Sequence, residues 1–392
     1  MAPLPPLVEP GAELSVEEIA RYSRHLILPD VGMAGQRRLK NARVLVVGAG
    51  GLGAPALLYL AAAGVGTLGI VDFDVVETSN LQRQVIHGVA DVGKSKAVSA
   101  RESVAAINPH VDVRLHEVRL DADNVTDIVA GYDVVVDGTD NFPTRYLVND
   151  AAVLAGKPLV WGSIYRFEGQ VSLFWDAAPD GRGLSYRDLY PVPPPAGSVP
   201  SCAEGGVLGV LCASIGAVMG TEVIKLVLGI GEPLLGRLLI YDALAMSYRT
   251  ISVRKDPDAD PVTELVDYDE LCGVAPAPAD PDADDISSIT ALELRARMAS
   301  ASPPLLVDVR EPGEADIVRI PGSVLVPQGR IASGEALGQL PRDRPIVLHC
   351  RSGARSAQAL RALRRAGFVD VTHLEGGVLA WVEQVDPSLP VY

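Results

Sequence analysis

A cysteine near the end of the chain stands where a reactive sulfur could be stabilised. Cys350 follows the apolar run 345–349 and precedes the helix-like segment 356–366. We therefore expect a strand, a loop and a helix, with the loop formed by Cys350, Arg351, Ser352, Gly353, Ala354 and Arg355. Backbone amides, a helix N-terminus and arginine side chains all favour an anion. Such a loop would stabilise the thiolate or the persulfide of Cys350.

Cysteine phosphatases use a similar loop, and their chemistry is the alternative for this cysteine. The phosphatase loop encircles a phosphate and needs one residue more than the four that separate Cys350 from Arg355. The smaller ring fits a sulfur atom, so we expect sulfur transfer.

A second anion-binding loop lies near the start of the chain. The apolar run 44–47 leads into GAGGLG at residues 48–53, and a helical pattern follows at 55–63. Glycines at this spacing let the backbone approach a phosphate at a helix N-terminus. Asp72 ends the next apolar run, where a carboxylate can accept hydrogen bonds from ribose hydroxyls. These features alone also fit an NAD-dependent oxidoreductase.

Charged residues beyond this loop distinguish adenylation from dinucleotide binding. The sequence SNLQRQ at 79–84 supplies Arg83, and Lys96 follows. Adenylation builds negative charge on the α-phosphate and on pyrophosphate, whereas a dinucleotide site has no evident use for two added cations. Asp140 follows a third apolar run, where a carboxylate could bind Mg²⁺. Each residue alone could be a helix cap or a surface ion-pair member, but their combination indicates adenylation.

The elements that must position these loops alternate between strand and helix. Amphipathic patterns at 91–107 and 144–155 predict helices between apolar, β-branched runs. The alternation predicts an α/β fold with a doubly wound, mainly parallel Rossmann-like sheet. Its predicted strands are 43–47, 67–71, 133–137, 159–161, 171–174 and 238–241. A second, smaller α/β domain is predicted to have strands at 305–309, 323–326, 346–349 and 371–374.

The length of 392 residues favours two domains. Residues 1–13 are proline-rich and are predicted to form a disordered tail. Residues 14–255 would form the adenylation domain and 286–392 the second domain. The segment between them, 256–285, is acidic and proline-rich, which is typical of a semi-extended linker.

Composition and charge exclude several functional classes. The net charge of −15 argues against a nucleic-acid-binding face. The uncharged stretch 205–221 is short and interrupted by glycine, so we expect a buried helix and no membrane contact. Four cysteines are too few for a disulfide framework, and no signal-peptide pattern opens the chain. We therefore expect a cytoplasmic protein.

Residues 14–255 resemble the ubiquitin-activating-like adenylyltransferases that charge sulfur-carrier proteins. The matching motifs are RYSRHLIL at 21–28, GAGGLG at 48–53, DFD at 72–74, SNLQRQ at 79–84, GKSK at 93–96 and DGTDN at 137–141.

This resemblance implies a complete nucleotide site. It implies that ATP is bound by Gly48, Gly50, Gly51, Gly53, Asp72, Asp74, Ser79, Asn80, Arg83, Gln84, Lys96, Asp140 and Asn141. It implies Mg²⁺ at Asp140 and catalytic roles for Arg83 and Lys96. It also implies a homodimer in which Arg24 reaches the phosphates bound by the neighbouring subunit.

The remaining cysteines carry separate predictions. Relatives often hold zinc with two CxxC pairs, but here SYRD at 185–188 and Cys272 occupy those places, so we expect no zinc. Cys202 precedes an apolar helix that starts near Val207, and a helix N-terminus lowers the pKa of a thiol. The resemblance implies that Cys202 takes part in the chemistry. Cys212 lies among apolar residues and is predicted to be a buried thiol.

Residues 286–382 resemble the rhodanese-family sulfurtransferases. The matching pieces are LVDVRE at 306–311, IPG at 320–322, CRSGARS at 350–356 and EGG at 375–377. Asp308 and Arg310 are expected to brace this domain, and Val318-Arg319 replaces the Gly-His usual in the family. The two domains together resemble the MoeZ-type adenylyltransferase/sulfurtransferases.

The resemblance implies a three-stage reaction. ATP adenylates the C-terminal glycine of a ubiquitin-like sulfur carrier that ends in Gly-Gly. Cys350, loaded as a persulfide by a cysteine desulfurase or by thiosulfate, then attacks the acyl-adenylate. Cys202 either resolves the resulting acyl disulfide, which releases a thiocarboxylate, or forms a glycyl thioester.

Other functions are also considered. The second domain could be a regulatory or docking module attached to an adenylyltransferase. An NAD-dependent oxidoreductase would leave Arg83, Lys96 and the second domain unexplained. Molybdopterin, thiamin, cysteine and related thio-biosynthesis are all compatible with the sequence.

Overall fold

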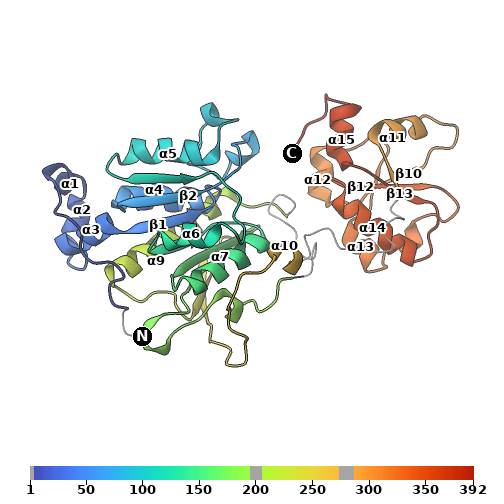
Figure 1. Cartoon of the computed structure of the whole chain (residues 1–392). Helices are drawn as coiled ribbons and strands as arrows, with labels where there is room; N and C mark the ends of the chain where they lie inside the picture. Colours follow the sequence, from blue (N-terminus) through green and yellow to red (C-terminus); the bar gives the residue numbers. More distant parts are fainter. Residues whose placement is uncertain (1–3, 195–204, 273–286) are drawn as a thin grey trace. The chain divides into compact units, whose positions relative to one another are not determined.

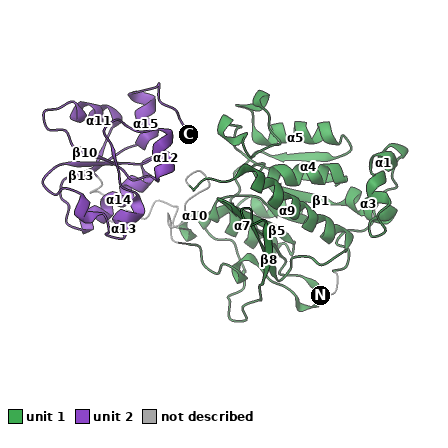
Figure 2. Cartoon of the chain, turned by 180° about the vertical axis from the view of Figure 1, so that it is seen from behind, with its two compact units in different colours: residues 1–275 green, residues 276–392 purple. Residues whose placement is uncertain are grey.

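The computed structural model describes residues 4–194, 205–272 and 287–392 (Figure 1). The chain divides into two compact units, Met1–Ala275 and Pro276–Tyr392, shown in different colours in Figure 2. Each unit buries its own apolar side chains, which confirms the expectation of two separate cores.

The sheet of the first unit is doubly wound. Among the described residues it has eight strands in the order β3-β2-β1-β4-β5-β6-β7-β8. The strands are β1 (Arg43–Val47), β2 (Thr67–Val71), β3 (Asp112–His116), β4 (Val134–Asp137), β5 (Leu159–Tyr165), β6 (Glu168–Phe174), β7 (Arg237–Asp242) and β8 (Ser247–Ser252). The pairs from β3 to β5 are parallel, and those from β5 to β8 are antiparallel. The mainly parallel sheet is as predicted.

Helices cover both faces of this sheet. They are α1 (Val16–Arg21), α2 (Ser23–Leu26), α3 (Gly32–Asn41), α4 (Gly53–Ala63), α5 (Lys96–Ile107), α6 (Val125–Ala130), α7 (Phe142–Leu154), α9 (Gly209–Leu228) and α10 (Tyr268–Leu271). The chain order β1-β2-β3 runs outward in one direction and β4-β5 runs in the other. Right-handed crossovers therefore place α4 and α5 on one face and α6 and α7 on the opposite face.

The long apolar helix α9 packs inside the first unit. It is long and apolar enough to span a membrane by length and composition. A Cβ added to Gly216 of α9 would lie 2.3 Å from Pro55 of α4, and one added to Gly169 of β6 would lie 2.3 Å from Ile215 of α9. Backbones approach this closely only in a packed core. The prediction of a buried helix here is confirmed, although α9 begins at Gly209.

The first unit is larger at both ends than the sequence suggested. Leu4 and Val8 are buried, and the Leu7 N–H donates to the Leu226 carbonyl at 3.0 Å. Residues 4–13 are therefore part of the unit instead of a disordered tail. Tyr268 is also buried within the predicted linker, so residues 256–272 belong to the first unit as well. The remainder of that linker, up to residue 285, lies outside the described residues.

The second unit has a parallel sheet between two layers of helices. The five strands that the structure describes there have the order β11-β10-β12-β13-β9. They are β9 (Ser288–Ile289), β10 (Leu305–Asp308), β11 (Val324–Leu325), β12 (Ile346–His349) and β13 (Val371–Leu374). The helices are α11 (Ala291–Met298), α12 (Pro312–Ile317), α13 (Gln328–Ala332), α14 (Ala354–Arg365) and α15 (Gly377–Gln384). Side chains of α13 and α14 fill one core, and those of α11 and α15 fill the other.

Two candidate active sites

The first unit has a cavity of about 570 Å³ at the carboxyl ends of its parallel strands. It lies at β1, β2 and β4, where the strand order reverses and ligands bind in doubly wound sheets. The predicted residues that line it are Gly48, Gly50, Gly51, Asp72, Asp74, Asn80, Arg83, Gln84, Lys96, Asp140 and Asn141. Two predicted residues, Gly53 and Ser79, are not part of this lining.

The glycine-rich loop turns too tightly for other residues. A Cβ at Gly53 would lie 1.8 Å from the Gly48 carbonyl oxygen, and Gly48 itself has φ +89°. Gly53 therefore contacts the main chain of the loop and does not line the cavity. No side chain caps α4 at Leu52, so the positive end of its helix dipole faces the loop, although the Ala54 N–H already donates to the Gly50 carbonyl at 2.9 Å. A Cβ at Gly51 would lie 2.8 Å from Cys212 Sγ, so the buried Cys212 supports the loop from α9.

Asp72 and His87 both contact the main chain of Ala49 in the loop, one at its N–H and the other at its carbonyl. The Asp72 carboxylate accepts hydrogen bonds from the N–H groups of Ala49 at 2.8 Å and Asp74 at 2.9 Å. Burial raises the pKa of Asp72 despite these bonds. A carboxylate offers about four lone-pair sites, so Asp72 can still accept ribose hydroxyls. His87, which the sequence did not single out, lies 3.1 Å from the Ala49 carbonyl and 2.8 Å from Ser99 Oγ.

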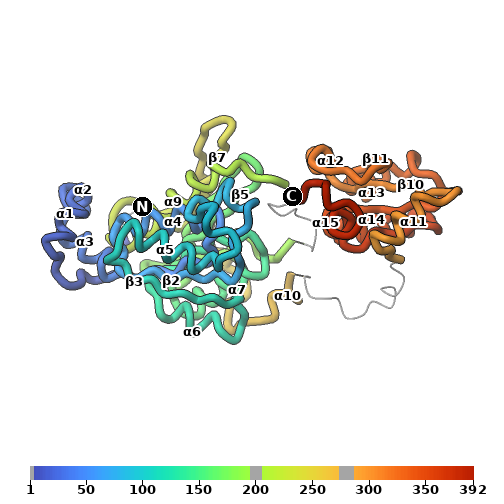
Figure 3. Tube along the Cα trace, turned by 90° about the horizontal axis from the view of Figure 1, so that it is seen from above, coloured from blue at the N-terminus to red at the C-terminus, as the bar shows by residue number. Residues whose placement is uncertain are grey.

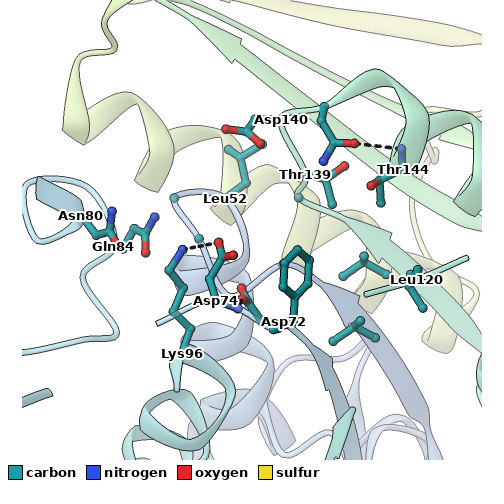
Figure 4. A pocket seen from close by; sticks show the side chains of 18 of the residues that line it. Leu52, Asp72, Asp74, Asn80, Gln84, Lys96, Leu120, Thr139, Asp140 and Thr144 are labelled. Carbon is teal, nitrogen blue, oxygen red and sulfur yellow. Dashed lines mark hydrogen bonds and ion pairs between the residues drawn. The ribbon is translucent and has the colours of Figure 1, made fainter. Parts of the chain in front are cut away.

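The two predicted cations, Lys96 and Arg83, line the cavity. Figure 4 shows Lys96 beside Asp74. Lys96 is the first residue of α5, and its Nζ pairs with Asp74 Oδ2 at 2.8 Å. Arg83 donates to the carbonyl of Ser79 at 3.1 Å, so Ser79 orients the arginine from outside the cavity. The predicted helix start at 91 was wrong, because Gly93 has φ +89° and breaks the helix before Lys96. This late start places Lys96 at the helix end that faces the cavity.

The opposite wall comes from β4 and α7. Asp140 is exposed and lines the cavity, whereas Asn141 caps α7 by accepting the Thr144 N–H at 2.9 Å. Among the described residues no group of three His, Cys, Asp or Glu side chains could hold a metal. Asp140 is the carboxylate of this wall that could hold Mg²⁺, an ion that prefers oxygen ligands. Arg145 is a further buried cation that the sequence did not reveal, and it donates to the Thr139 carbonyl at 3.0 Å.

Arg24 lies far from the cavity of its own subunit. Its neighbour Arg21 donates to the carbonyl of Ile107, the last residue of α5, at 2.8 Å. Lys96 begins that 12-residue helix, so the two ends are roughly 18 Å apart at 1.5 Å per residue. Figure 3 accordingly shows α1 and α2 at the end of the first unit that is away from α7. The Arg24 side chain is exposed on this distal surface.

The second candidate site surrounds Cys350. Its Sγ accepts a hydrogen bond from the Gly353 N–H at 3.1 Å, and the Ser356 hydroxyl lies 3.6 Å away. Only 1% of Cys350 is exposed. Gly353 has φ +104° and turns the chain into α14 at Ala354. Ala354 and Arg355 therefore belong to the helix, and the loop is shorter than predicted.

Both arginines of the predicted persulfide loop have partners other than the sulfur. Arg355 forms a bidentate ion pair with Glu314, with both N–O distances 2.7 Å. Arg351 donates through Nε to the main-chain oxygen of Tyr392 at 2.8 Å. The hydrogen bonds to the sulfur described here come from the Gly353 N–H and the Ser356 hydroxyl, and stabilisation of an anionic sulfur by Arg351 and Arg355 stays a prediction. Ser352 is exposed.

A buried ion pair braces the second unit, as predicted. Arg310 and Asp308 pair at 2.6 Å with both side chains almost fully buried. Arg310 also donates to the carbonyl of Val318 at 2.7 Å and to the Tyr392 hydroxyl at 2.7 Å.

An ion pair lies at the segments where the resemblance led us to look for zinc-binding CxxC pairs, residues 185–188 and Cys272. Arg187 donates to Asp150 at 2.9 and 2.7 Å, and the Tyr268 hydroxyl donates to the same carboxylate at 2.7 Å. Burial raises the pKa of Cys272 to about 11, so it is a neutral thiol. Cys202 lies outside the described residues.

Comparisons with known proteins agree with this division. Residues 22–262 match the ThiF family, and residues 290–384 match the rhodanese-like domain. The chain is 66% identical over 389 residues to the probable adenylyltransferase/sulfurtransferase MoeZ of Mycobacterium tuberculosis, covering 99% of both chains. It is 43% identical to the adenylyltransferase and sulfurtransferase MOCS3 of Drosophila yakuba, covering 97% of this chain and 86% of that one.

Two further comparisons concern the first unit. The sulfur carrier protein adenylyltransferase of Thermus thermophilus is 55% identical, and the match covers 66% of this chain and 98% of that protein. The crystal structure of E. coli MccB with ATP has the same fold, with a TM-score of 0.54, 22% identity, and coverage of 62% of this chain and 73% of that chain. The chain therefore belongs to the adenylyltransferase/sulfurtransferase family in which a ThiF-family domain is followed by a rhodanese-like domain.

Proposed function

We propose that this enzyme uses ATP and Mg²⁺ to adenylate the C-terminal glycine of a ubiquitin-like sulfur carrier ending in Gly-Gly. It then transfers sulfur from a persulfide on Cys350 to give the carrier thiocarboxylate. It would act as a cytoplasmic homodimer in molybdopterin, thiamin, cysteine or related thio-biosynthesis. The main support is the presence, in one chain, of a cation-lined cavity at an uncapped helix and a cysteine whose Sγ accepts a backbone N–H at 3.1 Å.

The first cavity supports adenylation through its charge distribution. The carrier carboxylate would attack the α-phosphorus of ATP, and the bond to the bridging oxygen would break to release pyrophosphate. Negative charge grows on both phosphate groups in this step. Lys96, Arg83 and the N-terminus of α4 would stabilise that charge. Asp74 holds Lys96 in place until the phosphates replace it as the partner.

The second site supports sulfur transfer through the position of its sulfur. A Cys350 thiolate would attack the outer sulfur of a donor persulfide, and the donor thiolate would leave. Because Cys350 Sγ is buried, the transferable atom would be the added sulfur, about 2 Å farther out along the S–S bond. A cysteine desulfurase persulfide is a suitable donor, and thiosulfate is the simpler alternative, with sulfite as its leaving group.

The persulfide would then react with the activated carrier. Its outer sulfur would attack the acyl carbon, and AMP would leave. The Cys202 thiolate would next attack the sulfur of Cys350 in the acyl disulfide. This step releases the carrier thiocarboxylate and leaves a Cys202–Cys350 disulfide, which a cellular dithiol must reduce.

Cys350→Ala separates the two activities. ATP–pyrophosphate exchange should stay near the wild-type rate, while thiocarboxylate formation, read by carrier mass, should disappear. Exchange should also require the last glycine of the carrier. Equal exchange with a carrier lacking that glycine, or loss of both activities together in Cys350→Ala, would contradict the proposal.

A further inference from the structure

Three polar side chains connect Cys350 to the interior of the second unit. Ser356 Oγ lies 3.6 Å from Cys350 Sγ and 3.3 Å from His373 Nδ1. Cys350 follows β12, Ser356 is on α14 and His373 is on β13. Ser356 is fully buried and His373 is 8% exposed. Residues from three different elements thus form a continuous path that bulk water does not reach easily.

We propose that His373 is the proton acceptor for the Cys350 thiol and that Ser356 relays the proton between them. The proposal rests on the proposed function only in taking Cys350 as the sulfur-carrying residue. The Cys350 S–H bond breaks as a new O–H bond forms on Ser356, and the original Ser356 proton moves to His373 Nδ1. The products are a thiolate and an imidazolium, with no change in oxidation state. The reverse path returns the proton from His373 through Ser356 to the Cys350 sulfur.

Ser356 is placed to serve both neighbours. Its hydroxyl also lies 2.9 Å from the Gly353 carbonyl. After the transfer, His373 Nδ1–H donates to Ser356 Oγ, and the single Ser356 proton, which donates to the Gly353 carbonyl at 2.9 Å in this structure, turns to the negatively charged thiolate instead. The Gly353 N–H supplies a second donor to the same sulfur. The path therefore ends in an anion with two hydrogen-bond donors, which is the form that attacks a donor persulfide.

The surroundings of His373 favour its neutral form before the transfer. Burial lowers its pKa, the Glu375 carboxylate opposes that effect and the Arg361 guanidinium adds to it. A neutral imidazole can accept a proton, whereas an imidazolium cannot.

His349 is next to Cys350 in sequence but is not an equivalent acceptor. It is fully buried, its Nδ1 is 3.9 Å from Asp308 Oδ1, and the described residues give neither ring nitrogen a hydrogen-bond partner. The Ser356 contact is thus what distinguishes His373 from His349.

The test measures alkylation of Cys350 by iodoacetamide in the full-length protein, quantified by peptide mass spectrometry from pH 5 to 10. His373→Gln keeps a hydrogen-bonding side chain that cannot titrate. We expect its alkylation profile to move to higher pH by about one unit, so that the rate at pH 7 falls about tenfold, because a one-unit shift is a tenfold change in the thiolate population. Ser356→Ala should shift the profile in the same direction.

Thr372→Val provides the matched control. Thr372 precedes His373 on β13, so its side chain points to the opposite face of the sheet. Its profile should coincide with that of the wild type. A wild-type profile in His373→Gln, or an equal shift in Thr372→Val, would overturn the role of His373. Alkylation needs neither ATP nor a carrier. Its result can therefore be interpreted even if the proposed adenylation fails.

Discussion

Arg355 donates both terminal guanidinium nitrogens to the carboxylate of Glu314, each at 2.7 Å. The Tyr392 hydroxyl donates to the same carboxylate at 3.0 Å. Burial raises the pKa of Glu314, but the bonds from Arg355 and from the Glu311 N–H outweigh burial and hold the pKa below its usual value. The positive charge of Arg355 is therefore paired with a carboxylate of α12. It does less to attract an anionic sulfur donor to Cys350 than an unpaired arginine would.

Glu314→Gln should both weaken the second unit and change its donor preference. Removing one member of a buried pair leaves an uncompensated charge and costs roughly 3 kcal/mol of unfolding free energy. The released Arg355 should lower the KM for the thiosulfate dianion several-fold with little change in kcat. Urea denaturation and steady-state sulfur transfer measure the two effects.

The exposed pair of Arg330 and Glu335 offers the comparison. Its N–O distance is 2.9 Å, and both side chains are at least 40% exposed. Glu335→Gln should change the unfolding free energy by less than about 1 kcal/mol. Equal destabilisation by the two substitutions would show that the Glu314 pair is no stronger than a surface contact.

The proposed homodimer, in which Arg24 lies a helix length from the cavity of its own chain, predicts complementation between subunits. Arg24→Ala and Lys96→Ala should each lose most pyrophosphate exchange, since arginines supplied in trans are worth ~10³–10⁵ in rate in other phosphoryl-transfer enzymes. Mixed subunits should regain activity, because one hybrid site keeps both Lys96 and a partner Arg24. Arg21→Ala is the control on the neighbouring helix and should stay active. Hybrids that form but show no exchange would place Arg24 outside the partner's site.

The Arg187–Asp150–Tyr268 cluster predicts that the first unit is stable without zinc. Chelators should leave its thermal midpoint unchanged, and elemental analysis should find no zinc. Arg187→Ala leaves the buried Asp150 carboxylate without its ion-pair partner. It should lower the free energy of unfolding by roughly 3–5 kcal/mol. Tyr268→Phe removes one hydrogen bond and should cost about 1 kcal/mol. One zinc ion per chain, or chelator-induced unfolding, would contradict this interpretation.

His349 predicts a loss of stability in mild acid. Burial lowers its pKa to about 4 from an ordinary 6.5. Between these values the unfolded chain binds a proton that the native second unit does not, so stability falls as the pH drops from 6.5 towards 4. The loss is roughly 3 kcal/mol at about 1.4 kcal/mol per pKa unit.

Hydrogen exchange of β12 and β13 peptides at pH 7, 6 and 5 in the full-length protein would detect this loss. His349→Gln should flatten the pH dependence in that window, whatever its effect at pH 7. A slope that persists in His349→Gln would assign the effect to other groups, such as His373, whose pKa is also lowered by burial.

Both strand–loop–helix units could be predicted from sequence because apolar runs, glycines and amphipathic helices follow one another directly. The edge strands β3 and β8 could not, because each is exposed on at least one side. Asp112–His116 has no fully buried residue, and every residue of Ser247–Ser252 is exposed. Without a continuous apolar run, such strands resemble loops in a single sequence.

Site residues that belong to a short sequence motif could be predicted. Contacts between residues far apart in the sequence could not. Asp140 closely follows β4, Lys96 ends the GKSK motif at the start of α5, and both line the cavity. The partner of Arg355 is Glu314, 41 residues away, and only the folded sheet brings them together. Residues 4–13 are predicted as a tail because a proline-rich sequence does not show that it will pack against the end of a helix.

The separation of the two cores has a consequence for the history of the gene. The described core of the first unit and those of the second have no residue in common. Two-thirds of this chain matches almost the whole of the Thermus thermophilus protein. A gene fusion could therefore join a free-standing ancestor of the first unit to a rhodanese-like domain without requiring compensating mutations in the core of either unit.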